Sequence, residues 1–254
     1  MPFSLPAELS WPLLAAVALA IVTAYLMFGA TGFGASIVSV PIVAHILPLT
    51  FVVPMITALD CGAVATATLR QWRHVDWPEF RRLLVPLVIG ITIGLTLLIN
   101  LPRGYALLAL GVFVASYAAY TLSGVREWRA ISTYWAIPLG IFGGMFSALF
   151  GTGGPVYMVY LASRIADKTA LRATSSLVIG FSVVLRAVAF VFSGMFLQQG
   201  LLVLAGLLVP LMLAGYALGS RLHARLSGAS VRRWVAWLLL ANGILLVVRA
   251  VEAL

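Results

Sequence analysis

Charged side chains are scarce in this sequence and make up only 9% of its 254 residues. A soluble domain of this length exposes far more charge, so the shortage excludes an ordinary soluble protein. Hydrophobic residues account for 63% of the chain instead, and its mean hydropathy is +1.10. Since each span needs about 20 mainly apolar residues, the sequence predicts an all-α integral membrane protein with about eight to ten crossings of the lipid bilayer.

Cysteine, histidine and acidic residues are also few. Cys61 is the single cysteine, which excludes an intrachain disulfide and a cysteine metal cluster. The three histidines lie far apart in the sequence, so we expect no metal site. Of the seven acids only Asp60 lies deep in an apolar segment, which is too little for the nucleophile and base, or the paired acids, of an intramembrane enzyme. We therefore expect no catalytic residue and no cofactor.

Ten apolar segments follow one another along the chain, and the sequence repeats itself. The second segment (35–47) and the seventh (156–163) are too short to cross as regular spans, and both follow a glycine-rich loop. The letters "LLVPL" occur at 83–87 and again at 207–211, each followed by a GxxxG pair, and "ATGFGAS" (30–36) has a counterpart in "GTGGPVY" (151–157). These landmarks predict two repeats of about five helical segments each, residues 1–130 and 131–254.

Basic residues give the chain a net charge of +9. In a membrane protein such charge is typical of cytoplasmic loops, so no nucleic-acid partner is expected. If each repeat changes sides an odd number of times, all basic residues except Arg103, Arg186 and Arg249 fall on one face. This predicts repeats of inverted orientation, with both termini outside. Short segments that cross fully and hairpins that turn back give the same result, and both remain open.

The glycine-rich loops do not fit three known kinds of glycine site. The first loop has the spacing GxxGxG without a preceding strand, unlike a dinucleotide fingerprint, and it lacks the GK[ST] ending of a P-loop. A potassium filter requires four equivalent loops, whereas this chain has one such loop and an unlike partner. The remaining interpretation is that each loop ends one helix and begins a short one.

The start of each short helix carries free N–H groups and the positive end of the helix dipole. Two such starts near the membrane midplane form an anion site, which makes a small anionic substrate the expected partner. The candidate substrate-binding residues are Thr31, Gly32, Phe33, Gly34, Thr152, Gly153 and Gly154. The alternative is that the glycines serve only close helix packing.

Two ionisable residues, Asp60 and Arg186, lie inside the third and eighth segments. Charges in a membrane span are usually functional or paired. Arg186 can hold an oxyanion through two parallel hydrogen bonds, and Asp60 is the candidate for a coupling proton. Ser175, on the same segment as Arg186, is a further candidate ligand. The alternative is a structural ion pair between Asp60 and Arg186.

The second repeat carries the strongest likeness to a known family. Residues 143–194 combine a glycine loop followed by Pro155, an Arg-Ala-Thr entry to the next span at 172–174, and Arg186 deeper in that span. In the first repeat, "GATGFGASIVSVPIV" with Pro41 and "HVDW" at 74–77 correspond to these elements. The chain thus resembles the TauE/SafE sulfite exporter family. The resemblance implies a transporter of the bacterial inner membrane that exports small sulfur oxyanions such as sulfite or organosulfonates, sulfoacetate among them.

These observations together favour a secondary transporter that works by alternating access around a central anion site. A proton, or the inside-negative membrane potential acting on the anion, would drive export. Two alternatives remain open at this point. One is a passive anion channel on the same scaffold, and the other is a non-transporting membrane protein that serves in assembly or as an enzyme.

Overall fold

The computed structural model describes residues 11–31, 34–68, 72–124, 131–222 and 228–252. Across these residues there are ten α-helices, three short 3₁₀ turns and no strand. The helices are α1 (Trp11–Thr31), α2 (Ala35–Val43), α3 (Leu49–Thr68), α4 (Trp77–Asn100), α5 (Arg103–Leu122), α6 (Ala136–Phe150), α7 (Gly154–Arg164), α8 (Lys168–Phe192), α9 (Leu201–Leu222) and α10 (Gly228–Glu252). The all-α class predicted from the sequence is confirmed.

Seven helices in the described part of the chain are long and apolar enough to cross a membrane, namely α1, α4, α5, α6, α8, α9 and α10. A shorter apolar helix, Leu49–Gly62, belongs to α3. The helices α2 and α7 have only 9 and 11 residues. At about 1.5 Å per residue, neither reaches the thickness of the hydrocarbon core. The expectation of a short helix after each glycine-rich loop is therefore confirmed.

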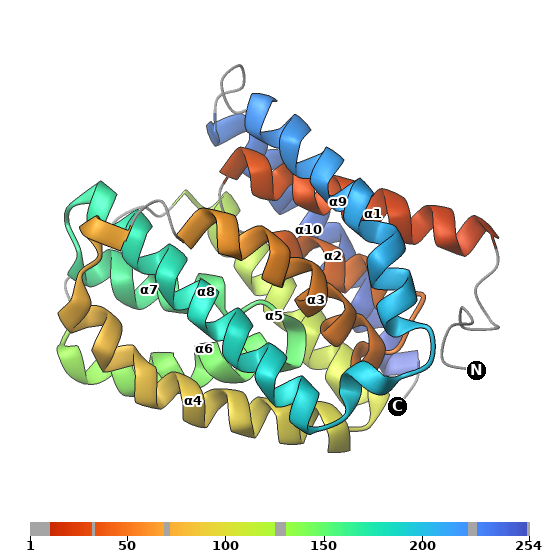
Figure 1. The fold of residues 1–254 in the computed structure, drawn as a ribbon, viewed down its shortest axis with the longest axis horizontal. Coiled ribbons are helices and arrows are strands. Elements are labelled where there is room, and N and C mark those ends of the chain that lie inside the picture. Colours follow the sequence, from red (N-terminus) through yellow and green to blue (C-terminus); the bar gives the residue numbers. More distant parts are fainter. Residues whose placement is uncertain (1–10, 32–33, 69–71, 125–130, 223–227, 253–254) are drawn as a thin grey trace. The chain divides into compact units, whose positions relative to one another are not determined.

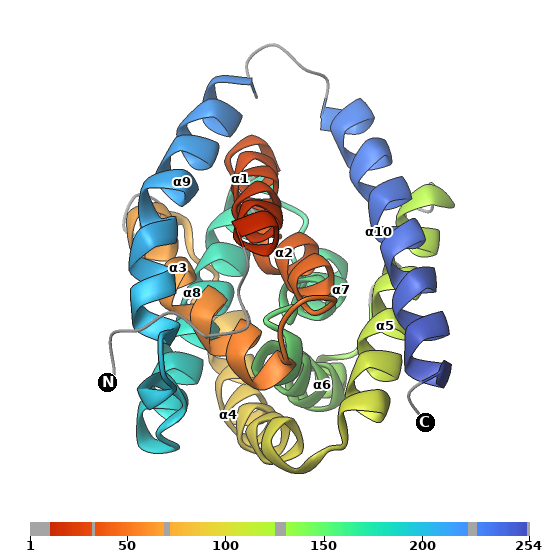
Figure 2. The same cartoon turned by 90° about the vertical axis from the view of Figure 1, so that its right-hand side faces the viewer.

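The chain divides into two compact units. The first comprises Met1–Leu59, Asn100–Val125 and Gly194–Leu254. Within it α1 packs on α9, α5 packs on α10, and α2 contacts α1, α5 and α10. Figure 2 shows α5 and α10 side by side. A methyl group added at Gly219 would overlap the carbonyl oxygen of Leu26, so α9 requires glycine there to lie this close to α1.

The second unit comprises Asp60–Ile99 and Arg126–Ser193, and contains α4, α6, α7 and α8 (Figure 1). Here α6 packs on α7 and α8, and α7 packs on α8. The helix α4 lies against α6 so closely that a methyl group at Gly90 would overlap the carbonyl oxygen of Ile141. Leu83 and Leu87 of α4 and Tyr160 of α7 belong to the buried core of this unit.

The two glycine contacts involve helices that the predicted repeat makes equivalent. Gly90 and Gly94 of α4 face α6, while Gly215 and Gly219 of α9 face α1. In the predicted repeat α4 corresponds to α9 and α6 corresponds to α1. The compact units draw helices from both predicted halves, and the repeat itself stays a prediction. The boundaries 1–130 and 131–254 stay a prediction.

Candidate functional site

The second glycine-rich loop connects α6 to α7. Gly151 has a φ of 71°, the left-handed conformation that glycine adopts without strain. Its N–H donates to the carbonyl oxygen of Ser147 at 2.8 Å, and the N–H of Thr152 donates to that of Phe146 at 3.3 Å. These bonds close the end of α6 in the manner of a glycine C-cap. The helix α7 then starts at Gly154, and Pro155 lies in its first turn, where a missing N–H costs nothing.

Thr152 has an unusual environment at the start of α7. The residue is 2% exposed, and its hydroxyl oxygen has no hydrogen-bond partner among the residues that the structure describes. Buried polar atoms in proteins nearly always have a partner, because an unmade bond is expensive. The first N–H groups of any helix also lack partners within that helix. The loop therefore places an uncommitted hydroxyl beside the positive end of the α7 dipole.

Arg186 lies on α8 in the same unit and is 1% exposed. Its Nη1 donates to the carbonyl oxygen of Ser147 at 2.7 Å and lies 3.4 Å from the hydroxyl of the same residue. Its Nη2 lies 3.4 Å from Oδ2 of Asp60, which is buried on α3. The ion pair that the sequence left open as an alternative is therefore present. A planar guanidinium with one edge towards a carboxylate is suited to hold a second oxyanion.

Three hydroxyl groups continue from Arg186 as a buried chain. The hydroxyl oxygens of Ser147 and Ser182 are 2.6 Å apart, and those of Tyr157 and Ser182 are 3.2 Å apart. All three residues are buried. Three hydroxyls carry three protons, and two bonds between them use two, so one donor proton remains. The site thus contains a cation and spare donors, which is the chemistry that binds an oxyanion.

Some of the sequence-predicted residues meet here. A methyl group added at Gly153 would overlap the carbonyl oxygen of Gly143 and lie 2.9 Å from Cβ of Ser147, the residue that Arg186 binds. Together with Thr152, Gly154 and the Asp60 pair, these contacts form what we call the α6–α7 loop site, defined by Asp60, Ser147, Thr152, Gly153, Gly154, Tyr157, Ser182 and Arg186.

Other predicted residues lie elsewhere. The Ser175 hydroxyl donates to the carbonyl of Arg172 in its own helix. It is about 16 Å along α8 from Arg186, so it does not belong to the loop site. Thr31 ends α1, and Gly34, with a φ of 98°, precedes α2, both in the other compact unit. Gly32 and Phe33 fall outside the described residues. The role of this first loop stays a prediction.

Sequence reasoning missed three hydroxyl residues of the loop site and one buried acid. Ser147, Tyr157 and Ser182 belong to the loop site, and Ser182 stands four residues before Arg186, the spacing that puts two side chains on one helix face. That spacing could have identified it. Glu79 was also missed: like Asp60 it is buried, although the sequence suggested Asp60 as the one deep acid. Within the described residues no group of three His, Cys, Asp or Glu is placed to hold a metal ion.

Comparison with known proteins identifies the family of this chain. A model of the family described as "Sulfite exporter TauE/SafE" matches residues 17–246. The chain belongs to this family. The TauE/SafE match covers α2 and α7, both glycine-rich loops and the Asp60–Arg186 pair. The likeness read from the sequence is confirmed, and this TauE/SafE protein is a multi-pass membrane transporter.

Two curated relatives are similar over long stretches. The "Probable sulfite/organosulfonate exporter TauE" of Cupriavidus necator is 24% identical over 255 residues, which cover 97% of this chain and 98% of the relative. The "Probable inner membrane transporter protein TsaS" of Comamonas testosteroni is 26% identical over 176 residues, 68% of this chain and 73% of the relative. No solved structure gives a significant match. These TauE/SafE relatives indicate transport rather than enzymatic activity.

Proposed function

We propose that the chain is a secondary transporter that exports small sulfur oxyanions, sulfite or organosulfonates such as sulfoacetate, by alternating access. The observation that carries the proposal is the buried Thr152 hydroxyl, which lacks a partner among the described residues at the start of α7. The anion would accept hydrogen bonds from Thr152 and from the N–H of Gly154, the first residue of α7, and would lie against the guanidinium of Arg186. The class of substrate comes from the name of the Cupriavidus necator relative.

Asp60 is the resident counter-ion of Arg186 in this proposal. Together the two groups are neutral, so an anion that enters the site adds a buried negative charge. Protonation of Asp60 offsets one unit of that negative charge and weakens the attraction between Asp60 and Nη2 of Arg186, which can then interact with the anion. The anion and one proton therefore bind together. A dianion that leaves with one proton carries one net negative charge, which the inside-negative potential drives out of the cell.

The test uses purified protein in liposomes, with sulfite, sulfoacetate, taurine, thiosulfate, sulfate and simple carboxylates as substrates. We expect saturable flux of a sulfur oxyanion, and stimulation of that flux by the same anion on the opposite side. Large currents that do not saturate would identify a passive channel. Saturable flux of carboxylates alone would rule out the proposed substrate class.

Thr152→Val tests the placement of the anion. Loss of a hydrogen bond to a charged group corresponds to about 1.5 to 3 kcal/mol, so the KM for the anion rises about tenfold or more. Thr57→Val is the matched control, because Thr57 is equally buried but donates to the carbonyl oxygen of Val53 in its own helix at 2.7 Å. Equal KM values for the two variants would place the anion elsewhere.

Localisation in the inner membrane, with both termini outside, belongs to the same proposal. Its support is the distribution of basic residues and the name of the Comamonas testosteroni relative, an inner membrane transporter protein. A cysteine at Gly228, the first residue of α10, in a Cys61→Ala background reports on the inner face. Reaction of this cysteine with an impermeant reagent added outside intact cells would contradict the proposed orientation.

A further inference from the structure

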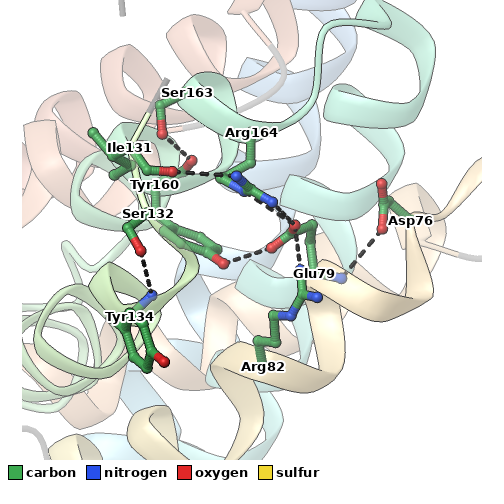
Figure 3. Close-up of polar contacts among 9 residues, drawn as sticks. All are labelled: Asp76, Glu79, Arg82, Ile131, Ser132, Tyr134, Tyr160, Ser163 and Arg164. Carbon is green, nitrogen blue, oxygen red and sulfur yellow. Dashed lines mark hydrogen bonds and ion pairs between the residues drawn. The ribbon is translucent and has the colours of Figure 1, made fainter. Parts of the chain in front are cut away.

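Glu79 lies in the first turn of α4 and is 5% exposed. Acidic residues are almost never buried unless they are paired. Figure 3 shows its carboxylate enclosed by three partners. Oε1 accepts from Nε and Nη2 of Arg164, both at 3.2 Å, and from Nη1 of Arg82 at 2.5 Å. Oε2 accepts from the hydroxyl of Tyr160 at 2.5 Å. Both carboxylate oxygens are therefore bonded to α7.

The backbone of Glu79 is fixed as well. Oδ1 of Asp76, which precedes α4, accepts from the N–H of Glu79 at 3.2 Å and so caps the helix. The N–H of Asp76 donates to the hydroxyl of Thr174 on α8 at 2.9 Å. Arg164 in turn donates to the carbonyl oxygen of Ile131 at 3.2 Å. The end of α7 is thus bonded to α4 and to the segment before α6, and the start of α4 is in turn bonded to α8.

The residues that contact Glu79 continue a stripe along α7 that begins at the loop site. Gly153, Tyr157, Tyr160 and Arg164 are spaced by four, three and four residues, so they face one side of the helix. Tyr157 contacts Ser182 in the loop site, whereas Tyr160 and Arg164 contact Glu79. Since α7 is a single helix of 11 residues, any rotation at its last turn is transmitted to its first, about 16 Å away.

We propose that Glu79 is a positioning residue for anion binding: it fixes the rotation and height of α7, and thereby the placement of Thr152 and Gly153. The inference rests on the function proposed above. It assigns to Glu79 a role beyond closing the start of α4, because three of its four side-chain hydrogen bonds go to α7.

The experiment compares Glu79→Gln with Arg82→Gln in the full-length protein, with sulfite as the probe. Glu79→Gln removes the charge that holds α7. Arg82 lies on α4 itself and its side chain is 44% exposed, so its loss leaves the contacts with α7 in place. We expect Glu79→Gln to raise the KM for sulfite about tenfold with a maximal rate within about twofold of wild type. Arg82→Gln should match wild type in both.

Hydrogen exchange of the α7 amides is the second measurement and does not depend on transport. We expect at least about fivefold faster exchange at residues 156–161 in Glu79→Gln than in Arg82→Gln. If Glu79→Gln does not fold, Tyr160→Phe serves instead, because it deletes only the hydroxyl that donates to Oε2 of Glu79. It should raise the KM for sulfite and the α7 exchange rate by about half as much as Glu79→Gln on a logarithmic scale.

The outcomes separate this inference from the proposed function. Absence of saturable flux in the wild-type protein refutes the proposed function. Hydrogen exchange tests the positioning role independently of transport: unchanged exchange of the α7 amides in Glu79→Gln refutes it. Faster exchange with an unchanged KM overturns the link between Glu79 and the anion. A fall in the maximal rate alone, or equal effects of Glu79→Gln and Arg82→Gln, also overturns it.

Discussion

The pair between Asp60 and Arg186 allows a direct test of whether Arg186 binds the anion or only stabilises the fold. The two charged groups are 3.4 Å apart and both residues are buried. With an effective dielectric constant of about 20, their attraction is about 5 kcal/mol. Removal of one partner leaves a buried charge without its counter-ion, which typically destabilises a protein by about 3 to 5 kcal/mol. We expect this loss for Arg186→Met and for Asp60→Asn.

The double variant should behave differently. Asp60→Asn together with Arg186→Met leaves no buried charge, so its free energy of unfolding should fall only by the about 1 to 3 kcal/mol that loss of the hydrogen bond from Arg186 costs, since the carbonyl of Ser147 keeps its bond from the N–H of Gly151. The sum of the single losses is about 6 to 10 kcal/mol, and the difference of several kcal/mol is the coupling between the two residues. Thermal or denaturant unfolding in detergent measures all four proteins of the cycle.

Transport then decides the role of Arg186. If the pair is only structural, the double variant regains stability and also anion flux in liposomes. If Arg186 holds the anion, the double variant folds but carries no saturable flux. Recovery of wild-type KM and maximal rate in the double variant would refute the site. Asp60→Asn alone provides the remaining control, because it should lose the pH dependence of flux while keeping a guanidinium for the anion.

Two further predictions concern stability. Gly153→Ala should lower the free energy of unfolding by about 3 kcal/mol, because the new methyl group would overlap the backbone of Gly143. Gly206→Ala is the control and should cause no loss, because there is open space around Gly206. Thermal unfolding of the two variants measures the difference. Burial, and to a smaller extent the charge of Arg249, hold the pKa of His45 below its usual 6.5. The contribution of the neutral His45 side chain to the free energy of unfolding is therefore complete above pH 6.5 and is lost as the pH falls below that value. The melting temperature should drop in acid, and less so in His45→Gln; an equal drop in both proteins contradicts this.

The sequence predicts the α6–α7 loop well because its signals are local. Glycine at Gly151 permits a left-handed turn, and Pro155 suits the first turn of a helix. The pairing of Asp60 with Arg186 could be named as an alternative, since buried charges need partners and no other acid lay deep in an apolar segment of the sequence. Composition and segment length were enough for the membrane class.

The role of Glu79 could not be predicted in the same way. In the sequence it stands three residues after Asp76, which is a common pattern for the start of a helix. Its partners Tyr160 and Arg164 are 81 and 85 residues away, and no local pattern connects them to it. A capping signature therefore concealed a long-range contact, because the same carboxylate can serve its own helix or a neighbour.

The two ends of α7 differ in a way that separates stability from function. At the end near Glu79, both carboxylate oxygens and the donors of Tyr160 and Arg164 are bonded to each other. At the start of α7, the buried hydroxyl of Thr152 lacks a partner among the described residues. Proteins rarely leave buried polar groups unsatisfied, and in the proposed function the transported anion is the partner of this hydroxyl. Substitutions near Glu79 should therefore act through the geometry of α7, whereas substitutions at Thr152 should act on the bound anion alone.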